Sequence, residues 1–169
     1  MSQDTVQEIC HYLDQQAAQY TLISHAETRT SDESARVRAE QGFTNVTGAK
    51  AILMKLERKH GTTEFDVFVL PSHLKLNSKT LKQRFPDVKS LRFATVEELA
   101  DLTGGLVPGS LPPFAKPIFS NLDSLFIDEL LVECDPIAFN VASLSQSLIM
   151  TCKDYIRVAS PKAIFAFAQ

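Results

Sequence analysis

The sequence has few cysteines and no long apolar run, and both shortages limit what this protein can be. Its three cysteines, Cys10, Cys134 and Cys152, are widely spaced, form no CxxC pair and have no histidine at zinc-ligand spacing. We therefore expect buried, reduced thiols. No stretch approaches the roughly 18 apolar residues of a membrane span, so we expect no membrane partner. The polar, acidic N-terminus is unlike a signal peptide, which predicts a cytoplasmic location.

The common motifs of catalytic and nucleotide-binding sites are also missing. There is no GxSxG elbow, no Walker loop, no GxGxxG after a strand and no HExxH. The four histidines are scattered along the chain and suggest neither a metal site nor an acid–base pair. We therefore expect no cofactor and no metal.

The composition is that of an ordinary globular protein, with one local excess of positive charge. A chain of 169 residues with 44% hydrophobic and 22% charged side chains predicts one domain spanning residues 1–169. The net charge is −3, yet residues 50–92 carry ten basic and four acidic side chains. Such a segment is either a solvated face or a local phosphate-binding surface on an acidic protein.

Periodicity and capping residues predict irregularly alternating helices and strands. We expect an N-terminal helix within residues 1–19, at 4–18, and further helices at 31–41, 79–85 and 95–104. Strands are expected at 20–25, 48–57, 63–70, 91–94, 117–120, 124–127, 137–142 and 147–151. A short helical turn at 153–156 and a last element at 162–168 follow. This order, with a hairpin at 48–70, favours an α+β fold with a mixed sheet.

Lys50 is conspicuous because it lies in an otherwise apolar strand, GAKAILM. A lysine in such a place must extend to water, find a partner or have its pKa lowered by burial. One interpretation is a lysine at the strand edge that points to solvent. The other is a cation held rigidly at a cleft, where it binds a carbonyl, phosphate or carboxylate.

The stretch TGGLVPGSLPPF, at residues 103–114, holds three of the six glycines and three of the eight prolines. Gly104 and Gly105 are typical of a helix end. Gly109 lies four residues before Pro113, and glycine allows the backbone to approach a ligand and expose its N–H groups. The segment is therefore either a rigid crossover or a loop whose backbone binds a ligand.

Taken in order, several segments resemble one known family. His25 ends an early strand, Lys50 lies in AKAILM, and KLNSKTLKQRF, LRFATVEELADLTG and the GxxxP loop PGSLPPF follow. FIDELL and FNVASLSQSLIM come later. Over about residues 25–155 the chain is similar to the YbaK and prolyl-tRNA synthetase-associated editing domains. The resemblance implies a mainly antiparallel, partly barrel-like mixed sheet flanked by helices, and hydrolysis of the aminoacyl ester of mischarged tRNA.

The resemblance also implies roles for particular residues. The catalytic positions would be Lys50, Gly109 and Ser110. The substrate pocket would include His25, Leu111, Pro112, Pro113, Asn140 and Ser143. Acceptor-stem phosphates would be bound by Lys79, Lys82 and Arg84. The partners would be the acceptor end of a mischarged tRNA and, in addition, an aminoacyl-tRNA synthetase. The alternative is a non-catalytic module that binds an aminoacyl or nucleotide ligand, or a protein partner.

Overall fold

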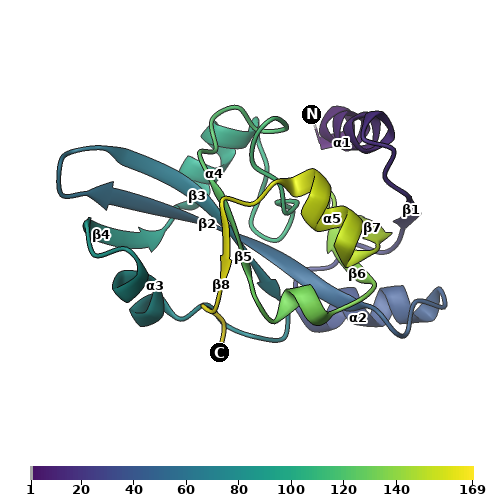
Figure 1. The fold of residues 1–169 in the computed structure, drawn as a ribbon. Coiled ribbons are helices and arrows are strands. Elements are labelled where there is room, and N and C mark those ends of the chain that lie inside the picture. Colours follow the sequence, from purple (N-terminus) through teal and green to yellow (C-terminus); the bar gives the residue numbers. More distant parts are fainter. Residues whose placement is uncertain (1) are drawn as a thin grey trace.

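The computed structural model describes residues 2–169, with side chains from Asp4 onward, and contains both helices and strands (Figure 1). The helices are α1 (Ser2–Gln15), α2 (Ser31–Glu40), α3 (Ser78–Arg84), α4 (Val96–Thr103) and α5 (Cys152–Ala159), with a 3-10 turn η1 (Leu131–Glu133). The strands are β1 (Tyr20–Ser24), β2 (Thr47–Arg58), β3 (Thr63–Pro71), β4 (Val88–Phe93), β5 (Leu125–Asp128), β6 (Ile137–Asn140), β7 (Gln146–Met150) and β8 (Ala163–Phe165). The predicted α+β class is confirmed.

The strands form one mixed sheet built around the long hairpin of β2 and β3. Its order is β1-β7-β6-β2-β3-β5-β8, and β4 pairs with β2 outside this path. The β1–β7, β7–β6, β2–β3 and β2–β4 pairs are antiparallel, whereas β2–β6, β3–β5 and β5–β8 are parallel. The longest ladders are thus antiparallel, as predicted. The sheet is not closed, since β1 and β8 end the path, so the barrel-like character stays incomplete.

Helix starts follow the capping residues that the sequence contains. Thr30 accepts a hydrogen bond from the Glu33 N–H at the start of α2, and Asn77 caps α3 in the same way. At α4, which was predicted at 95–104, Thr95 and Glu98 form a reciprocal capping box. The N-terminal helix differs from the prediction, because α1 ends at Gln15 rather than continuing to residue 18.

The predicted strand at 117–120 is wrong, because this segment consists of turns. Phe119 is 6% exposed and its N–H donates to the Ala115 carbonyl at 2.9 Å. The apolar run therefore fills the core from a turn, without strand pairing. The short turn expected at 153–156 is part of a longer helix, α5, and the last predicted element is the three-residue strand β8.

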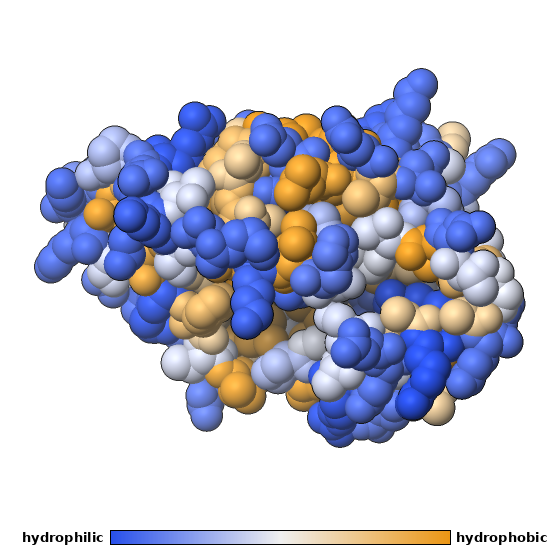
Figure 2. All heavy atoms as spheres, turned by 90° about the horizontal axis from the view of Figure 1, so that it is seen from below, coloured by the Kyte–Doolittle hydropathy of each residue, from blue (hydrophilic) through white to orange (hydrophobic). Residues whose placement is uncertain are grey.

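The core lies on both faces of the β2–β3 hairpin. On one face Val67 and Val69 pack with residues of α1 and of the loop after α4. On the other face Phe68 and Leu70 join a smaller aromatic cluster. Seen from below, hydrophilic residues cover both ends of the molecule and hydrophobic atoms are exposed mainly between them (Figure 2). Within residues 2–169, no helix is both long and apolar enough to cross a lipid bilayer.

Candidate functional site

The sheet is interrupted along one edge of β2. On that edge β6 pairs only with Thr47 and Gly48, and β4 pairs only from Met54 onward. The intervening backbone has no strand partner there in the described chain, although the Ala94 N–H donates to the Leu53 carbonyl at 2.9 Å. This open edge therefore leaves room for a ligand in the middle of the sheet.

Two cavities lie along the open edge. The first has a volume of about 230 Å³ and the second about 210 Å³. Ala51, Ile52, Gly109 and Leu111 line both, so the two cavities meet where the loop after α4 crosses the strand. Such a continuous groove suits a ligand with two chemically different parts.

The first cavity is polar and positively charged. Its charged lining residues are Arg29, Arg38 and Lys50, and none of its lining residues is acidic. Lys50 is half-buried, and burial, together with the nearby charge of Lys75, lowers its pKa. The structure thus places Lys50 in the wall of a cavity, in line with the cleft interpretation of this residue.

The second cavity is mostly apolar. Leu53, Leu99 and Pro108 contribute to its wall, and Phe93 and Val96 line it although they are 55% and 56% exposed. Large hydrophobic side chains at the mouth of a cavity offer flat contact surface to an incoming ligand.

The loop after α4 brings its backbone to both cavities. Gly109 has a φ of +88°, a backbone conformation that favours glycine. Gly109 and Leu111 both line the two cavities. Ser110 lines neither cavity. Its hydroxyl donates to the Val107 carbonyl and accepts from the Val107 N–H, while its own N–H donates to the Val107 carbonyl. Ser110 therefore holds the turn in place, and its neighbours face the ligand space.

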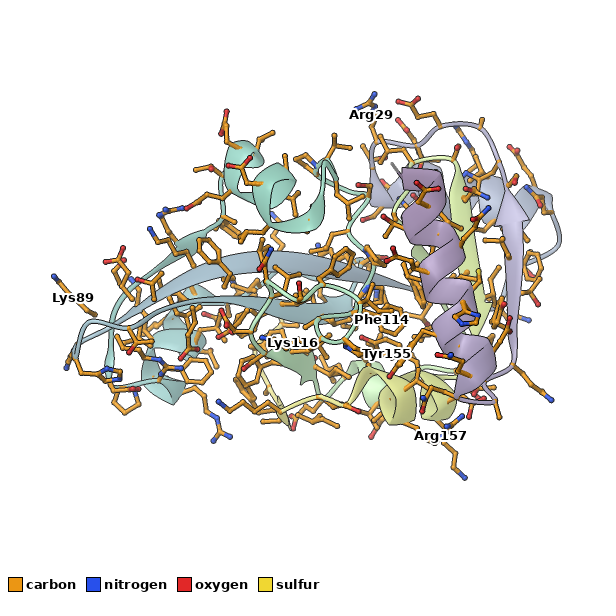
Figure 3. The ribbon with its side chains drawn as sticks, turned by 90° about the horizontal axis from the view of Figure 1, so that it is seen from above. Arg29, Lys89, Phe114, Lys116, Tyr155 and Arg157 are labelled. Atoms are coloured by element: carbon orange, nitrogen blue, oxygen red, sulfur yellow. The ribbon has the colours of Figure 1, made fainter. Side chains whose placement is uncertain are left out.

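Pro112 and Pro113 are buried behind this loop and line neither cavity. The Pro113 carbonyl accepts a 2.7 Å hydrogen bond from the hydroxyl of Tyr155, which is fully buried. Phe114 packs edge-on against the Tyr155 ring with centroids 5.7 Å apart. Figure 3 shows the two residues next to each other. The prolines thus anchor the loop to α5.

Asn140 connects the loop to a buried network of polar side chains. Its Nδ2 donates to the Gly109 carbonyl at 2.9 Å, and its Oδ1 accepts from Arg38 at 3.2 Å. Ser147 lies next to both, and a ring nitrogen of His25 is 2.8 Å from its hydroxyl. Asn140 lines the first cavity, whereas His25 lines neither. Sequence reasoning missed Arg38, because a single arginine on a polar helix carries no motif.

The remaining predicted residues lie away from the cavities. Ser143 caps the turn between β6 and β7, where its hydroxyl accepts from the Ser145 N–H at 3.0 Å. Lys79 and Lys82 are exposed on α3, and Arg84 lies over the Phe165 ring at 4.7 Å. Figure 1 shows α3 and α2 at opposite ends of the molecule.

Several cations of the basic segment are neutralised within the fold. Arg58 pairs with both Glu64 and Asp87, and Arg92 pairs with Glu98. Glu64 and Asp87 belong to residues 50–92 themselves, so only Glu98, which lies outside the segment, offsets part of its positive excess. Among residues 2–169, no three His, Cys, Asp or Glu side chains are grouped so as to hold a metal ion.

Solved structures share this fold. Hypothetical protein APE2540 has a TM-score of 0.76 at 18% identity, covering 95% of this chain and 99% of that chain. A proposed trans-editing enzyme for prolyl-tRNA synthetase has a TM-score of 0.74 at 18% identity, with 98% and 96% covered. At these identities the likeness concerns the fold alone.

Sequence comparison is more specific. The chain is 28% identical over 161 residues to proteins from two strains of Escherichia coli, K12 and O157:H7, each named multifunctional Ser/Thr-tRNA deacylase ProXp-y. The alignment covers 95% of this chain and 91% of theirs. The family model for the aminoacyl-tRNA editing domain matches residues 25–158. The predicted relationship is confirmed, and the chain belongs to the aminoacyl-tRNA editing domain family.

Proposed function

We propose that this protein is a cytoplasmic deacylase that hydrolyses the aminoacyl ester of mischarged tRNA in trans. The observation that carries the proposal is the open edge of β2, where Lys50 and the Gly109 loop face one continuous groove. An ester is already reactive, so correct positioning and stabilisation of developing charge suffice for hydrolysis by water.

In this proposal, backbone N–H groups of the Gly109 loop stabilise the negative charge that develops during hydrolysis. The N–H groups of Gly109 and Leu111 have no hydrogen-bond partner among the described residues, and both residues line the groove. Two such donors stabilise the oxyanion that forms when water attacks the ester carbonyl. Because the Ser110 N–H and hydroxyl are bound to Val107, we place this role on its two neighbours.

Lys50 supplies the positioning. In the proposal its ammonium binds the phosphate of the terminal nucleotide and thereby fixes the ester beside the loop. The attacking water is then oriented by backbone groups and by the free ribose hydroxyl of the substrate. The terminal base lies over the second cavity, where the exposed ring of Phe93 offers a stacking surface.

The test is deacylation of a panel of mischarged tRNAs by the wild type and by Lys50→Ala. The panel begins with seryl and threonyl esters, because the E. coli relatives are named Ser/Thr-tRNA deacylases. Loss of a charge-assisted contact predicts that kcat/KM falls about 30-fold or more. Lys89→Ala is the matched control, since Lys89 lies at the far end of the molecule from Arg29 of the first cavity (Figure 3).

Two outcomes would contradict the proposal. If the wild type hydrolyses no member of the panel, the protein is not a deacylase, and binding of the same tRNAs would favour a non-catalytic module. If Lys50→Ala hydrolyses its substrate like the wild type, the role proposed for this lysine is wrong.

We also retain the prediction that α3 contacts acceptor-stem phosphates. Lys79 and Lys82 are exposed and Arg84 is partly engaged with Phe165, so the two lysines are the better candidates. Replacing both with alanine should raise KM and weaken its salt dependence without changing kcat. Pull-down with prolyl-tRNA synthetase tests the predicted synthetase partner.

A further inference from the structure

Arg38 is a buried cation without a counter-charge. Arg38 is only 4% exposed to solvent. Its Nε donates to the Ser147 hydroxyl and its Nη2 to the Asn140 Oδ1, both at 3.2 Å. Both partners are neutral, and Arg38 forms no ion pair with any described residue. Burial lowers the pKa of its guanidinium to about 10, which still leaves it protonated at neutral pH. Such a charge is costly unless an anion compensates it.

Arg38 shares the first cavity with other positive groups. Lys50 and Arg29 line the same cavity, and Arg29 pairs with Glu27 at the surface. The N-cap Thr30 and the first residue of α2, Ser31, also line it, so the positive end of that helix faces the same space. Lys50 and Arg38 are therefore the inner cations, and no acidic residue lines the cavity to neutralise them.

Gly48 keeps this corner open. A Cβ at position 48 would lie 2.3 Å from the Ser72 Oγ and 3.5 Å from the Arg38 Nη1. Gly48 and Lys50 are two residues apart on β2, so both face the same side of the strand. The missing side chain thus lets the guanidinium and the Ser72 hydroxyl lie beside the strand, on the face from which Lys50 projects.

The Arg38 guanidinium has N–H donors that are free to bind a ligand. A guanidinium carries five N–H donors, and only the Nε and Nη2 of Arg38 form hydrogen bonds within the described chain. Planar guanidinium donors match the oxygens of a phosphate, and Lys50 adds a second point charge.

We propose that Arg38, together with Lys50 and the start of α2, forms a phosphate site. Its ligand is the phosphate on the 5′ side of the terminal nucleotide, an identification that rests on the proposed function. An aminoacyl ester has no free carboxylate, whereas this phosphate accompanies every tRNA end. Arg38 is therefore a substrate-binding residue that acts deeper in the groove than Lys50.

The experiment compares the binding of 5′-AMP and adenosine by calorimetry. The wild type should bind 5′-AMP at least about tenfold more tightly than adenosine, because charge-assisted hydrogen bonds to the phosphate are lost in adenosine. Arg38→Gln keeps an amide donor for Asn140 or Ser147 and should abolish most of this difference. Arg36→Gln, on the exposed face of the same helix, should leave the difference unchanged.

The proposal is overturned if wild-type protein binds both ligands equally, or if folded Arg38→Gln keeps the wild-type preference. Should that variant fail to fold, the NMR signal of the Arg38 Nε–H in the wild type tests the phosphate site instead. It should shift with 5′-AMP and inorganic phosphate and stay in place with adenosine, and equal behaviour with all three refutes the site. If the protein deacylates no tRNA but still prefers 5′-AMP to adenosine in a way that depends on Arg38, the proposed deacylase function is wrong and the phosphate site stands.

Discussion

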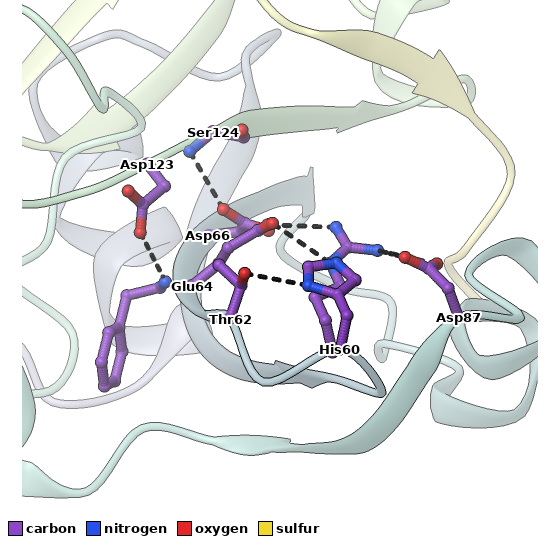
Figure 4. A network of polar contacts seen from close by, with 9 residues as sticks. His60, Thr62, Glu64, Asp66, Asp87, Asp123 and Ser124 are labelled. Carbon is purple, nitrogen blue, oxygen red and sulfur yellow. Dashed lines mark hydrogen bonds and ion pairs between the residues drawn. The ribbon is translucent and has the colours of Figure 1, made fainter.

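Replacing Asp66 with asparagine removes a carboxyl group that the fold keeps protonated near neutral pH. Asp66 lies in β3, is completely buried, and accepts a 3.0 Å hydrogen bond from the Ser124 N–H at one oxygen (Figure 4). Its other oxygen, Oδ2, has no hydrogen-bond partner among the described residues. Burial raises the pKa of Asp66 to about 8, and the neighbouring carboxylates of Glu64 and Asp123 add to the rise.

The raised pKa predicts a loss of stability with rising pH. An aspartate in the unfolded chain titrates near pH 4, so between about pH 4 and 8 the folded protein holds the extra proton. The free energy of unfolding then falls by up to ~1.4 kcal/mol per pH unit as the pH rises through this window. In Asp66→Asn the side-chain amide would still accept from the Ser124 N–H and cannot ionise, so this slope should disappear.

The other groups with shifted pKa values named here titrate outside the range from pH 5 to 7.5. The pKa values of Glu64, Glu98 and Asp154 are lowered by their partners, so their stabilisation is lost only as the pH falls below about 4.5. Burial raises the pKa of Cys152 to about 11, so this thiol changes the pH dependence of stability only above the range from pH 5 to 7.5. Between pH 5 and 7.5, Asp66 is therefore the dominant shifted group.

Urea unfolding of the wild type and Asp66→Asn at four pH values between 5 and 7.5 measures the effect. The stability of the variant relative to the wild type should rise with pH, by up to ~1.4 kcal/mol per unit. Asp101→Asn, at an exposed carboxylate on α4, should change nothing. If the wild type and Asp66→Asn give parallel curves, the protonated state of this carboxyl is refuted.

Three further changes test the loop, the groove and the backbone. Gly109→Ala places alanine at a φ of +88°, which costs about 1–2 kcal/mol, and we expect kcat for deacylation to fall about tenfold; an unchanged kcat would contradict the loop's role. Phe93→Ala should raise KM about 5- to 100-fold by removing base stacking, whereas Ile164→Ala, at a side chain 41% exposed on β8, should not; equal effects would refute stacking. Ala17→Gly, at an exposed residue with a φ of 55°, should stabilise the fold by about 1 kcal/mol in thermal unfolding, whereas Ala35→Gly within α2 should destabilise it by a similar amount.

Local elements were predictable because their signals lie in neighbouring residues. The cap at Thr30, the capping box at Thr95 and the β2–β3 hairpin all depend on residues within a few positions of one another. The order of His25, Lys50 and the GxxxP loop similarly predicted the family before the fold was known.

The strand expected at 117–120 is wrong because its surroundings come from distant parts of the chain. The run at 117–120 has the composition of a strand, but it packs as a turn because the core around Phe119 accepts it in that form. The catalytic role expected of Ser110 stays a prediction; the structure adds that its hydroxyl and N–H are bound to Val107, three residues away, while its neighbours Gly109 and Leu111 line the groove.

The sequence by itself determined most of the elements, the family and two of the groups that line the groove, Lys50 and the Gly109 loop. Only the tertiary structure decided that β2 has an open edge, because that edge depends on where β6 and β4 stop pairing with it. It also decided that Arg38 is buried beside the first cavity. A surface arginine and a buried, uncompensated one look alike in a sequence, since the difference lies in the absence of a nearby carboxylate in three dimensions.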